Sequence, residues 1–290
     1  MPSLKDIRRR IGSVKNTQKI TRAMKLVAAA KFARASASVV ASRPYGEAFD
    51  AMVGHLVAAA GEDVSSPLLV ENPEARALVV VLSTDRGFCG GLNTNLFKQT
   101  VQFINKKKAA GVTVEVLPWG RRARQFGAKN GFTLQGGREK VLEKPNYEQA
   151  KELAGELVKH FAGSGYDRVY LGFVEFKSAM SQAPKFIQVL PVGNLKQATA
   201  GAELADANIL VEPGIKQILD GVLKREVASL VFRSMLEGAA SEHGARMTAM
   251  DSATNNANEV LRRMKIQYNR ARQAAITKEL IEITSGAQAI

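Results

Sequence analysis

The feature that most constrains the fold of this 290-residue chain is its long C-terminal stretch without proline. Pro213 suits the first turn of a helix, and the pattern after it predicts one helix that runs to about Ser285, with Gly286 as its stop. A helix of this length spans roughly 110 Å at the standard rise per residue. The rest of the chain is too small to bury it, so we expect this helix to protrude.

A regular spacing of three and four residues runs along this segment and predicts a coiled coil of about four heptads. Its members are Met247, Met250, Thr254, Ala257, Leu261, Met264, Tyr268, Ala271 and Ala275. These side chains are mostly small or flexible, which favours close but yielding packing against a partner helix.

The N-terminal segment is the expected partner helix. It contains no proline between residue 3 and about residue 42, and it has apolar residues at helical spacing. These residues are Leu4, Ile7, Ile11 and Val14, followed after a polar interruption by Ile20, Met24 and Val27. Pro44 predicts a kink or a break, after which the helix resumes and stops at Gly61.

The middle of the chain alternates between strand-like and helix-like segments. Strands are expected at 77–82, 112–117, 168–176 and 186–192, and helices at 92–110, 121–129 and 147–162. This alternation is typical of an α/β sheet. Because the ends of a domain often lie close together, the two terminal helices are expected to be antiparallel.

The predicted fold class is therefore α/β, with a long antiparallel coiled coil of N- and C-terminal helices and a central Rossmann-like α/β domain. The expected limits are 1–60 for the first helix, 61–210 for the α/β domain and 211–290 for the last helix. Residues 61–74 and 195–208 have the composition of linkers.

Positive charge is concentrated near the N-terminus. The net charge is +14, and residues 1–43 hold eleven Lys and Arg residues against Asp6 alone. This balance favours an acidic partner: nucleic acid, anionic lipid or an acidic protein surface. A basic coiled-coil nucleic-acid-binding protein is the alternative interpretation. Against it, Phe32 is the only aromatic residue before Tyr45, and no known DNA-binding module is present.

The loop TDRGFCGGLN, residues 84–93, follows the first predicted strand, where a dinucleotide site would lie. Its glycines do not match the G-x-G-x-x-G pattern, and no P-loop signature is present, so a dinucleotide-dependent enzyme is disfavoured. The glycines are expected to form a tight turn. Cys89, the single cysteine, is expected to be a small buried residue rather than a nucleophile.

No set of residues in the sequence suggests catalysis or a bound cofactor. The three histidines are far apart and lack the spacing of metal ligands, and no nucleophile is paired with a base. We therefore expect no catalytic, cofactor-binding or metal-binding residues. No stretch approaches ~20 uninterrupted apolar residues, so no membrane-spanning helix is expected.

Several blocks of the sequence resemble the γ subunits of F-type, proton-transporting ATP synthases. They are the opening LKDIRRRIGSVKNTQKITRAMKLVAAAKFARA, the loop TDRGFCGGLN, and the C-terminal blocks EHGARMTAMDSATNNANE and NRARQAAITKELIEITSGAQA. These blocks cover both ends and the centre of the chain.

The resemblance implies a central-stalk rotor subunit without a catalytic site of its own. Its two terminal helices would enter the hexameric ring of α and β subunits, and its α/β domain would lie beside ε on the membrane ring of c subunits. Proton flow would turn the c ring and the shaft, which would change nucleotide affinity at the catalytic β subunits. The implied location is peripheral, on the cytoplasmic face of a bacterial inner membrane, and nucleic acid is not an implied partner.

The resemblance also assigns contacts to residues of the first helix. Met24 matches a methionine that faces an acidic β-subunit loop, and Arg22 and Lys25 would supply positive charge beside it. The alanine-rich stretch Ala28–Ala30 and the stretch Thr254–Ala257 are expected to form small, smooth bearing surfaces that let the shaft turn.

Five further positions are assigned in the same way. Arg272 and Gln273 match residues that meet β-subunit loops near the upper bearing, and Thr277 and Glu279 lie in the same coupling region. Ile209 matches a position near the c ring.

Overall fold

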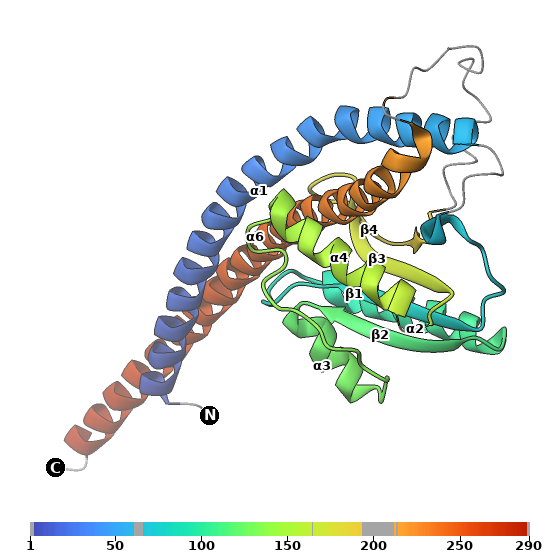
Figure 1. Cartoon of the computed structure of the whole chain (residues 1–290). Coiled ribbons are helices and arrows are strands. Elements are labelled where there is room, and N and C mark those ends of the chain that lie inside the picture. Colours follow the sequence, from blue (N-terminus) through green and yellow to red (C-terminus); the bar gives the residue numbers. More distant parts are fainter. Residues whose placement is uncertain (1–2, 61–65, 164, 193–211, 213, 289–290) are drawn as a thin grey trace.

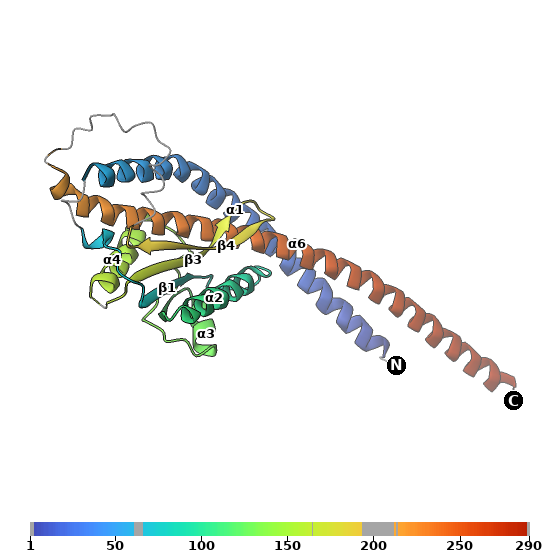
Figure 2. The ribbon, with the colours of Figure 1, turned by 90° about the vertical axis from the view of Figure 1, so that its right-hand side faces the viewer.

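The computed structural model describes residues 3–60, 66–163, 165–192, 212 and 214–288. Two long helices, α1 (Leu4–Ala60) and α6 (Ile215–Gln288), lie side by side along a globular body and leave it as a two-helix shaft (Figure 1). Figure 2 shows the same shaft from the side, with α6 extending further from the body than the start of α1. The predicted protruding pair of helices is confirmed.

The two helices are antiparallel, as the contacts between them show. The hydroxyl oxygens of Thr21 and Thr254 lie 2.8 Å apart, and Lys25 Nζ lies 2.6 Å from Asp251 Oδ1. Moving toward the C-terminus along α1 therefore moves toward the N-terminus along α6. The shaft is a helical hairpin closed by the globular body.

The predicted coiled-coil seam of α6 is confirmed. Met250, Ala257 and Leu261 are buried, and the other predicted members are partly buried. Between residues 258 and 280, every residue outside the predicted seam is exposed. The heptad pattern therefore predicted the correct contact face of α6. Over much of its length this helix has only one neighbouring helix.

The predicted stripe of α1 is confirmed in part, since Ile7 is buried and Leu4, Ile11, Val14 and Met24 are partly buried. Ile20 and Val27, by contrast, are 60% and 58% exposed. The contact face instead passes through the polar residues Gln18 and Thr21 and then reaches Ala28, which is 2% exposed. Of the polar run at 15–19, only Gln18 belongs to the contact face, where its amide donates a hydrogen bond to Asn258 of α6.

Two predicted helix ends are also corrected. No break occurs at Pro44, since α1 is continuous through it and the exposed proline removes only one backbone hydrogen bond from a long helix. The curvature of α1 over the body in Figure 1 is consistent with the kink that was the other expectation. Gly286 does not stop α6, which reaches Gln288.

The body contains a four-stranded sheet with the order β2-β1-β3-β4. Its strands are β1 (Arg76–Leu82), β2 (Thr113–Trp119), β3 (Arg168–Phe176) and β4 (Gln182–Leu190). β1 pairs in parallel with both β2 and β3, whereas β4 is antiparallel to β3 and forms one edge. The α/β prediction is confirmed, and the sheet is mixed.

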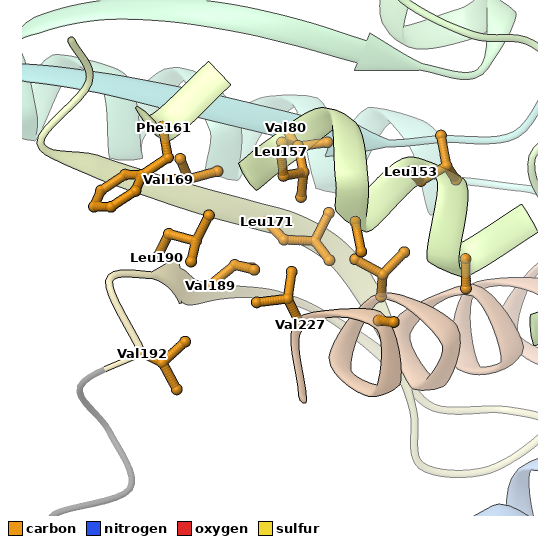
Figure 3. Close-up of a cluster of buried hydrophobic side chains, with 14 of the residues drawn as sticks. Val80, Leu153, Leu157, Phe161, Val169, Leu171, Val189, Leu190, Val192 and Val227 are labelled. Carbon is orange, nitrogen blue, oxygen red and sulfur yellow. The ribbon is translucent and has the colours of Figure 1, made fainter. Parts of the chain in front are cut away.

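Helices cover both faces of this sheet. α2 (Leu92–Ala109) covers one face, α4 (Tyr147–Gly163) and α6 cover the other, and α3 (Arg121–Lys129) packs near β2. A short 3-10 helix, η1 (Pro67–Leu69), precedes β1. Figure 3 shows Leu157 of α4 and Val227 of α6 near Leu171 of β3, with Leu153 one turn away on α4.

The position of strand β1 in the middle of the body explains its continuous apolar sequence. Leu78, Val80 and Leu82 belong to the core shared with α4 and α6, whereas Ala77 and Val79 belong to the core beneath α2. Both faces of the strand are buried, so a continuous apolar run is required.

The edge strand β4 begins at Gln182, four residues before the predicted start at Phe186. Its first half is polar and contains Pro184, and an edge strand tolerates proline because one side needs no partner. The predicted limit between the α/β domain and the last helix, at residues 210 and 211, lies outside the described residues.

Candidate functional site

The name upper shaft is used here for residues 4–28 of α1 together with residues 247–288 of α6. Of the eleven Lys and Arg residues in segment 1–43, all except Lys25 are exposed. The α1 side of the upper shaft therefore presents positive charge to its surroundings. Charge of this kind attracts acidic surfaces over a distance of about a Debye length, roughly 8–10 Å at moderate salt.

The three α1 residues expected to meet a partner differ in their environments. Arg22 is exposed, whereas Met24 and Lys25 are partly buried. Lys25 reaches across the interface to Asp251 of α6 at 2.6 Å. Its charge is therefore partly neutralised within the shaft, and Arg22 is the cation of this group that points outward.

The four predicted residues near the end of α6 lie close together on the tip of the shaft. Arg272, Gln273, Thr277 and Glu279 are all exposed. Figures 1 and 2 show that α6 extends beyond the start of α1, so the tip is a single helix. Ile209, the remaining predicted position, lies outside the described residues.

The expected bearing surfaces of small residues are only partly on the outside. Ala28 and Ala257 are 2% and 8% exposed, so both pack inside the seam, and Thr254 is partly buried beside Thr21. The prediction of an outer bearing is wrong for these residues. Small side chains here let the two helices approach closely, and Ala30 remains exposed.

A cavity of about 360 Å³, which we name the junction pocket, lies where the shaft meets the body. It is bounded by α1, by the loop 84–91, by residues 140–143 and by α6. Met24, Val27 and Phe88 contribute apolar surface, and Lys31, Arg86 and Arg246 add basic groups to its lining. Met24 thus lies at the boundary between the shaft and the body.

The loop 84–91 fastens the body to α6. The carboxylate of Asp85 accepts hydrogen bonds from the backbone N–H groups of Arg121 and Lys140, each at 2.9 Å. Arg246 of α6 donates a hydrogen bond to the carbonyl oxygen of Gly87 at 3.2 Å. These bonds give the loop a structural role between two parts of the molecule.

Helix α6 packs close to the same loop, at the point where a dinucleotide would approach. Gly90 has a φ of +57°, as expected for a tight turn, and a Cβ atom placed on it would lie 3.8 Å from Ala249 of α6. Helix α6 therefore lies against the start of α2. A cavity of about 230 Å³ remains between this loop, α2 and α6, so the case against a dinucleotide site rests on the missing glycine fingerprint.

The titratable groups near the junction pocket are poorly placed for catalysis. Burial, together with the charges of Arg246 and Lys31, lowers the pKa of His243 to about 4. Burial raises the pKa of Cys89, and it raises the pKa of Glu242 despite its ion pair with Arg246. At neutral pH the imidazole is uncharged and the thiol keeps its proton, so neither an activated base nor a thiolate is present here.

A cluster that the sequence analysis missed lies at the base of the shaft. Arg233 of α6 pairs with Asp50 of α1, and the buried Glu226 lies beside them. No sequence pattern marks this cluster, since Asp50 and Arg233 are 183 residues apart and meet only when the hairpin forms.

Comparison with known proteins shows which family has this sequence and fold. A family model described as ATP synthase matches residues 3–290. The ATP synthase gamma chain of Geobacter metallireducens is 45% identical over 290 residues, covering 100% of this chain and 99% of that protein. The gamma chain of Anaeromyxobacter sp. strain Fw109-5 is 42% identical, with full coverage of both.

The chain belongs to the ATP synthase γ family. It is a non-catalytic, central-stalk rotor subunit of an F-type ATP synthase, as its resemblance implied. The alternatives of a nucleic-acid-binding protein and of a dinucleotide-dependent enzyme are set aside by this membership.

Solved structures share the γ-family fold. A chain of the Euglena gracilis mitochondrial ATP synthase (OSCP/F1/c-ring, rotational state 3) aligns with a TM-score of 0.70 at 19% identity, over 99% of this chain and 94% of that one. A chain of the Tetrahymena thermophila central stalk/c-ring aligns with a TM-score of 0.62 at 23% identity, over 81% and 99%. None of the described helices has the length and apolar character needed to cross a membrane.

Proposed function

We propose that this chain carries torque from a proton-driven ring of c subunits to the catalytic hexamer of α and β subunits, with ε bound beside its α/β body. The observation that carries the proposal is the two-helix shaft, which is anchored in the body at its base and extends alone beyond it. A part that transmits torque needs stiffness along its length and a firm connection at the driven end. This chain has both.

The exposed charge of α1 supports a contact with acidic β-subunit loops. Arg22 presents an exposed cation, and the flexible apolar side chain of Met24 lies in the same turn of α1, on the side that lines the junction pocket. Attraction between an exposed cation and an acidic loop is long-ranged and has no fixed register, so it tolerates movement. Lys25 contributes less in this proposal because Asp251 already pairs with it.

The single-helix tip supports a second contact region. Arg272, Gln273, Thr277 and Glu279 are exposed near the end of α6, which extends beyond the start of α1. In the proposal these residues meet β-subunit loops near the upper bearing during rotation. Ile209 is proposed to lie near the c ring, on the strength of the family resemblance alone.

The finer location is also a proposal. The curated relatives named above are bacterial, and the c ring is a membrane ring. We therefore place this chain at the cytoplasmic face of a bacterial inner membrane, attached peripherally through the complex.

Co-purification from the native host tests the proposal directly. Tagged chain should recover α and β in equal amounts, together with ε and, in mild detergent, the c ring. Recovery of the chain alone, or with nucleic acid whose binding falls steeply with salt, would contradict the proposal.

A substitution at the tip tests the assigned contacts. In the assembled complex, Arg272→Ala should lower ATP synthesis at least severalfold, because an exposed cation that meets the β subunits is lost. Arg270→Ala is the matched control: it removes an equally exposed arginine, which lies about 200° around the helix. If the two substitutions lowered ATP synthesis equally, the proposed contact between Arg272 and the β subunits would be contradicted.

A further inference from the structure

Three charged side chains meet at the base of the shaft, where α1 and α6 pack on the body. Asp50 of α1 accepts two hydrogen bonds from Arg233 of α6, at 2.9 and 2.7 Å, which is a bidentate pair. Glu226, two turns before Arg233 on α6, brings its Oε1 atom to 3.7 Å from the same guanidinium. Two carboxyl groups thus face one cation.

Gly46 gives Arg233 room to pass over α1. A Cβ atom at Gly46 would lie 2.7 Å from Arg233 Cδ and 2.8 Å from its Nη1 atom. A side chain at this position would crowd the arginine where it crosses α1 to reach Asp50, one turn further along. The guanidinium is held against Asp50 by its two hydrogen bonds and lies 3.7 Å from Glu226, beyond hydrogen-bonding distance.

Glu226 is the buried member of the cluster. It is 1% exposed, its Oε2 atom has no hydrogen-bond partner among the described residues, and its neighbours Leu223 and Val227 are fully buried. A carboxylate in such a place is costly unless it is paired and hydrogen-bonded. With both acids ionised, the cluster would carry one excess negative charge in an apolar setting.

A proton on Glu226 removes this excess charge. Burial, with a further contribution from the Asp50 carboxylate, raises the pKa of Glu226 to about 8, and Arg233 only partly offsets this. Asp50 from α1 and Arg233 from α6 are the charged groups that act on Glu226 within the described part of the chain. The protonated carboxyl can also donate a hydrogen bond to Asp50.

We propose that Glu226, Asp50 and Arg233 form a proton-dependent latch that holds α1 to α6 at the base of the shaft. The latch is closed while Glu226 carries a proton and loosens when the proton leaves. It would make the driven end of the shaft more firmly held below neutral pH than in alkaline conditions.

The sign of the effect follows from proton binding. An exposed glutamate in the unfolded chain loses its proton near pH 4.5, whereas the folded chain keeps the Glu226 proton to about pH 8. Between these values the folded state binds one more proton, so the stability contributed by the latch falls as pH rises. Above about pH 8 the loss is complete and the dependence levels off.

Hydrogen–deuterium exchange of the full-length chain tests the latch. The readout is the opening of residues 46–60 of α1 and 219–235 of α6 between pH 6 and pH 9, corrected for intrinsic exchange and referred to α2. In the wild type, opening of these segments should increase about tenfold or more, since each unit of pKa shift is worth a factor of ten. In Glu226→Gln the side chain is permanently neutral, and the increase should disappear.

Two further variants make the test decisive. Glu259→Gln removes an exposed acid from the same helix and should behave as the wild type does. Asp50→Asn frees Arg233 to pair with Glu226, which should ionise at lower pH, and the increase should again disappear. The proposal is overturned if the wild type shows no pH-dependent opening, or if either Glu226→Gln or Asp50→Asn retains it. The test uses this chain alone, so its failure would leave the proposed rotor role untouched.

Discussion

The base and the upper part of the same two-helix shaft are held together in different ways. At the base, the α1–α6 interface contains Val53, Leu223, Val227 and Val231, each 0% exposed. In the upper shaft, even the buried positions retain some exposure, as with Leu261 at 9%. The base is part of a three-layer core, whereas the upper shaft is a two-helix rod.

The base of the shaft therefore anchors it to the body, whereas the upper shaft is exposed for contact with partner subunits. Helix α4 and strand β3 pack against the base of α6, so the helix cannot shift there without disturbing the sheet. Higher up, each helix has one neighbour and keeps most of its surface for partners. A rotor needs this arrangement, because torque enters through a rigid base and is delivered through an exposed shaft.

The largest expected effect on stability comes from removing a buried side chain at the base of the shaft. Leu223→Ala should lower the free energy of unfolding by about 3 kcal/mol, because a fully buried leucine leaves a cavity. Leu261→Ala makes the same change in the upper shaft and should cost about 1 kcal/mol, since solvent and neighbouring side chains can fill the space. Urea unfolding of the two variants measures the difference. Equal losses would mean that the two regions are packed alike.

A smaller effect is expected at the polar seam of the upper shaft. Thr254→Val should cost about 1 kcal/mol or less, because the mostly buried hydroxyl of Thr21 loses a neighbour at 2.8 Å. Adding Thr21→Val should recover part of this loss, since two apolar groups of similar shape then face each other. Thermal unfolding of the two single variants and the double variant gives the coupling. Strict additivity would exclude a direct Thr21–Thr254 interaction.

The smallest effect is expected at the ion pair of the upper shaft. Lys25 and Asp251 are 39% and 47% exposed, so Lys25→Gln should cost only a few tenths of a kcal/mol, and less at high salt. Unfolding curves at low and high salt measure it. A loss above about 2 kcal/mol that is insensitive to salt would show that the pair behaves as a buried one, as in the base.

Much of the fold could be predicted because each element carries its own local signal. The α6 seam repeats every seven residues for several turns, and β1 is apolar throughout because both of its faces are buried. The α1 stripe was harder to predict. Gln18 and Thr21 are polar, and their place in the interface depends on the hydrogen-bonding side chains that α6 puts opposite them.

The latch cluster lay beyond prediction for a similar reason. Asp50, Glu226 and Arg233 are unremarkable residues of amphipathic helices until the hairpin brings them together. Gly46 acquires a role only because Arg233 crosses above it. Contacts of this kind depend on the register between two distant helices, which no local pattern specifies.

Single-molecule rotation of the assembled catalytic complex tests the central claim most directly. Met180, on the β3–β4 turn of the body, is 88% exposed, so Met180→Cys offers a site for a probe. The native Cys89 is 2% exposed and should not react. With the α/β ring fixed to a surface, ATP should drive the probe around in one direction. Continued ATP hydrolysis with a stationary probe would contradict the rotor account.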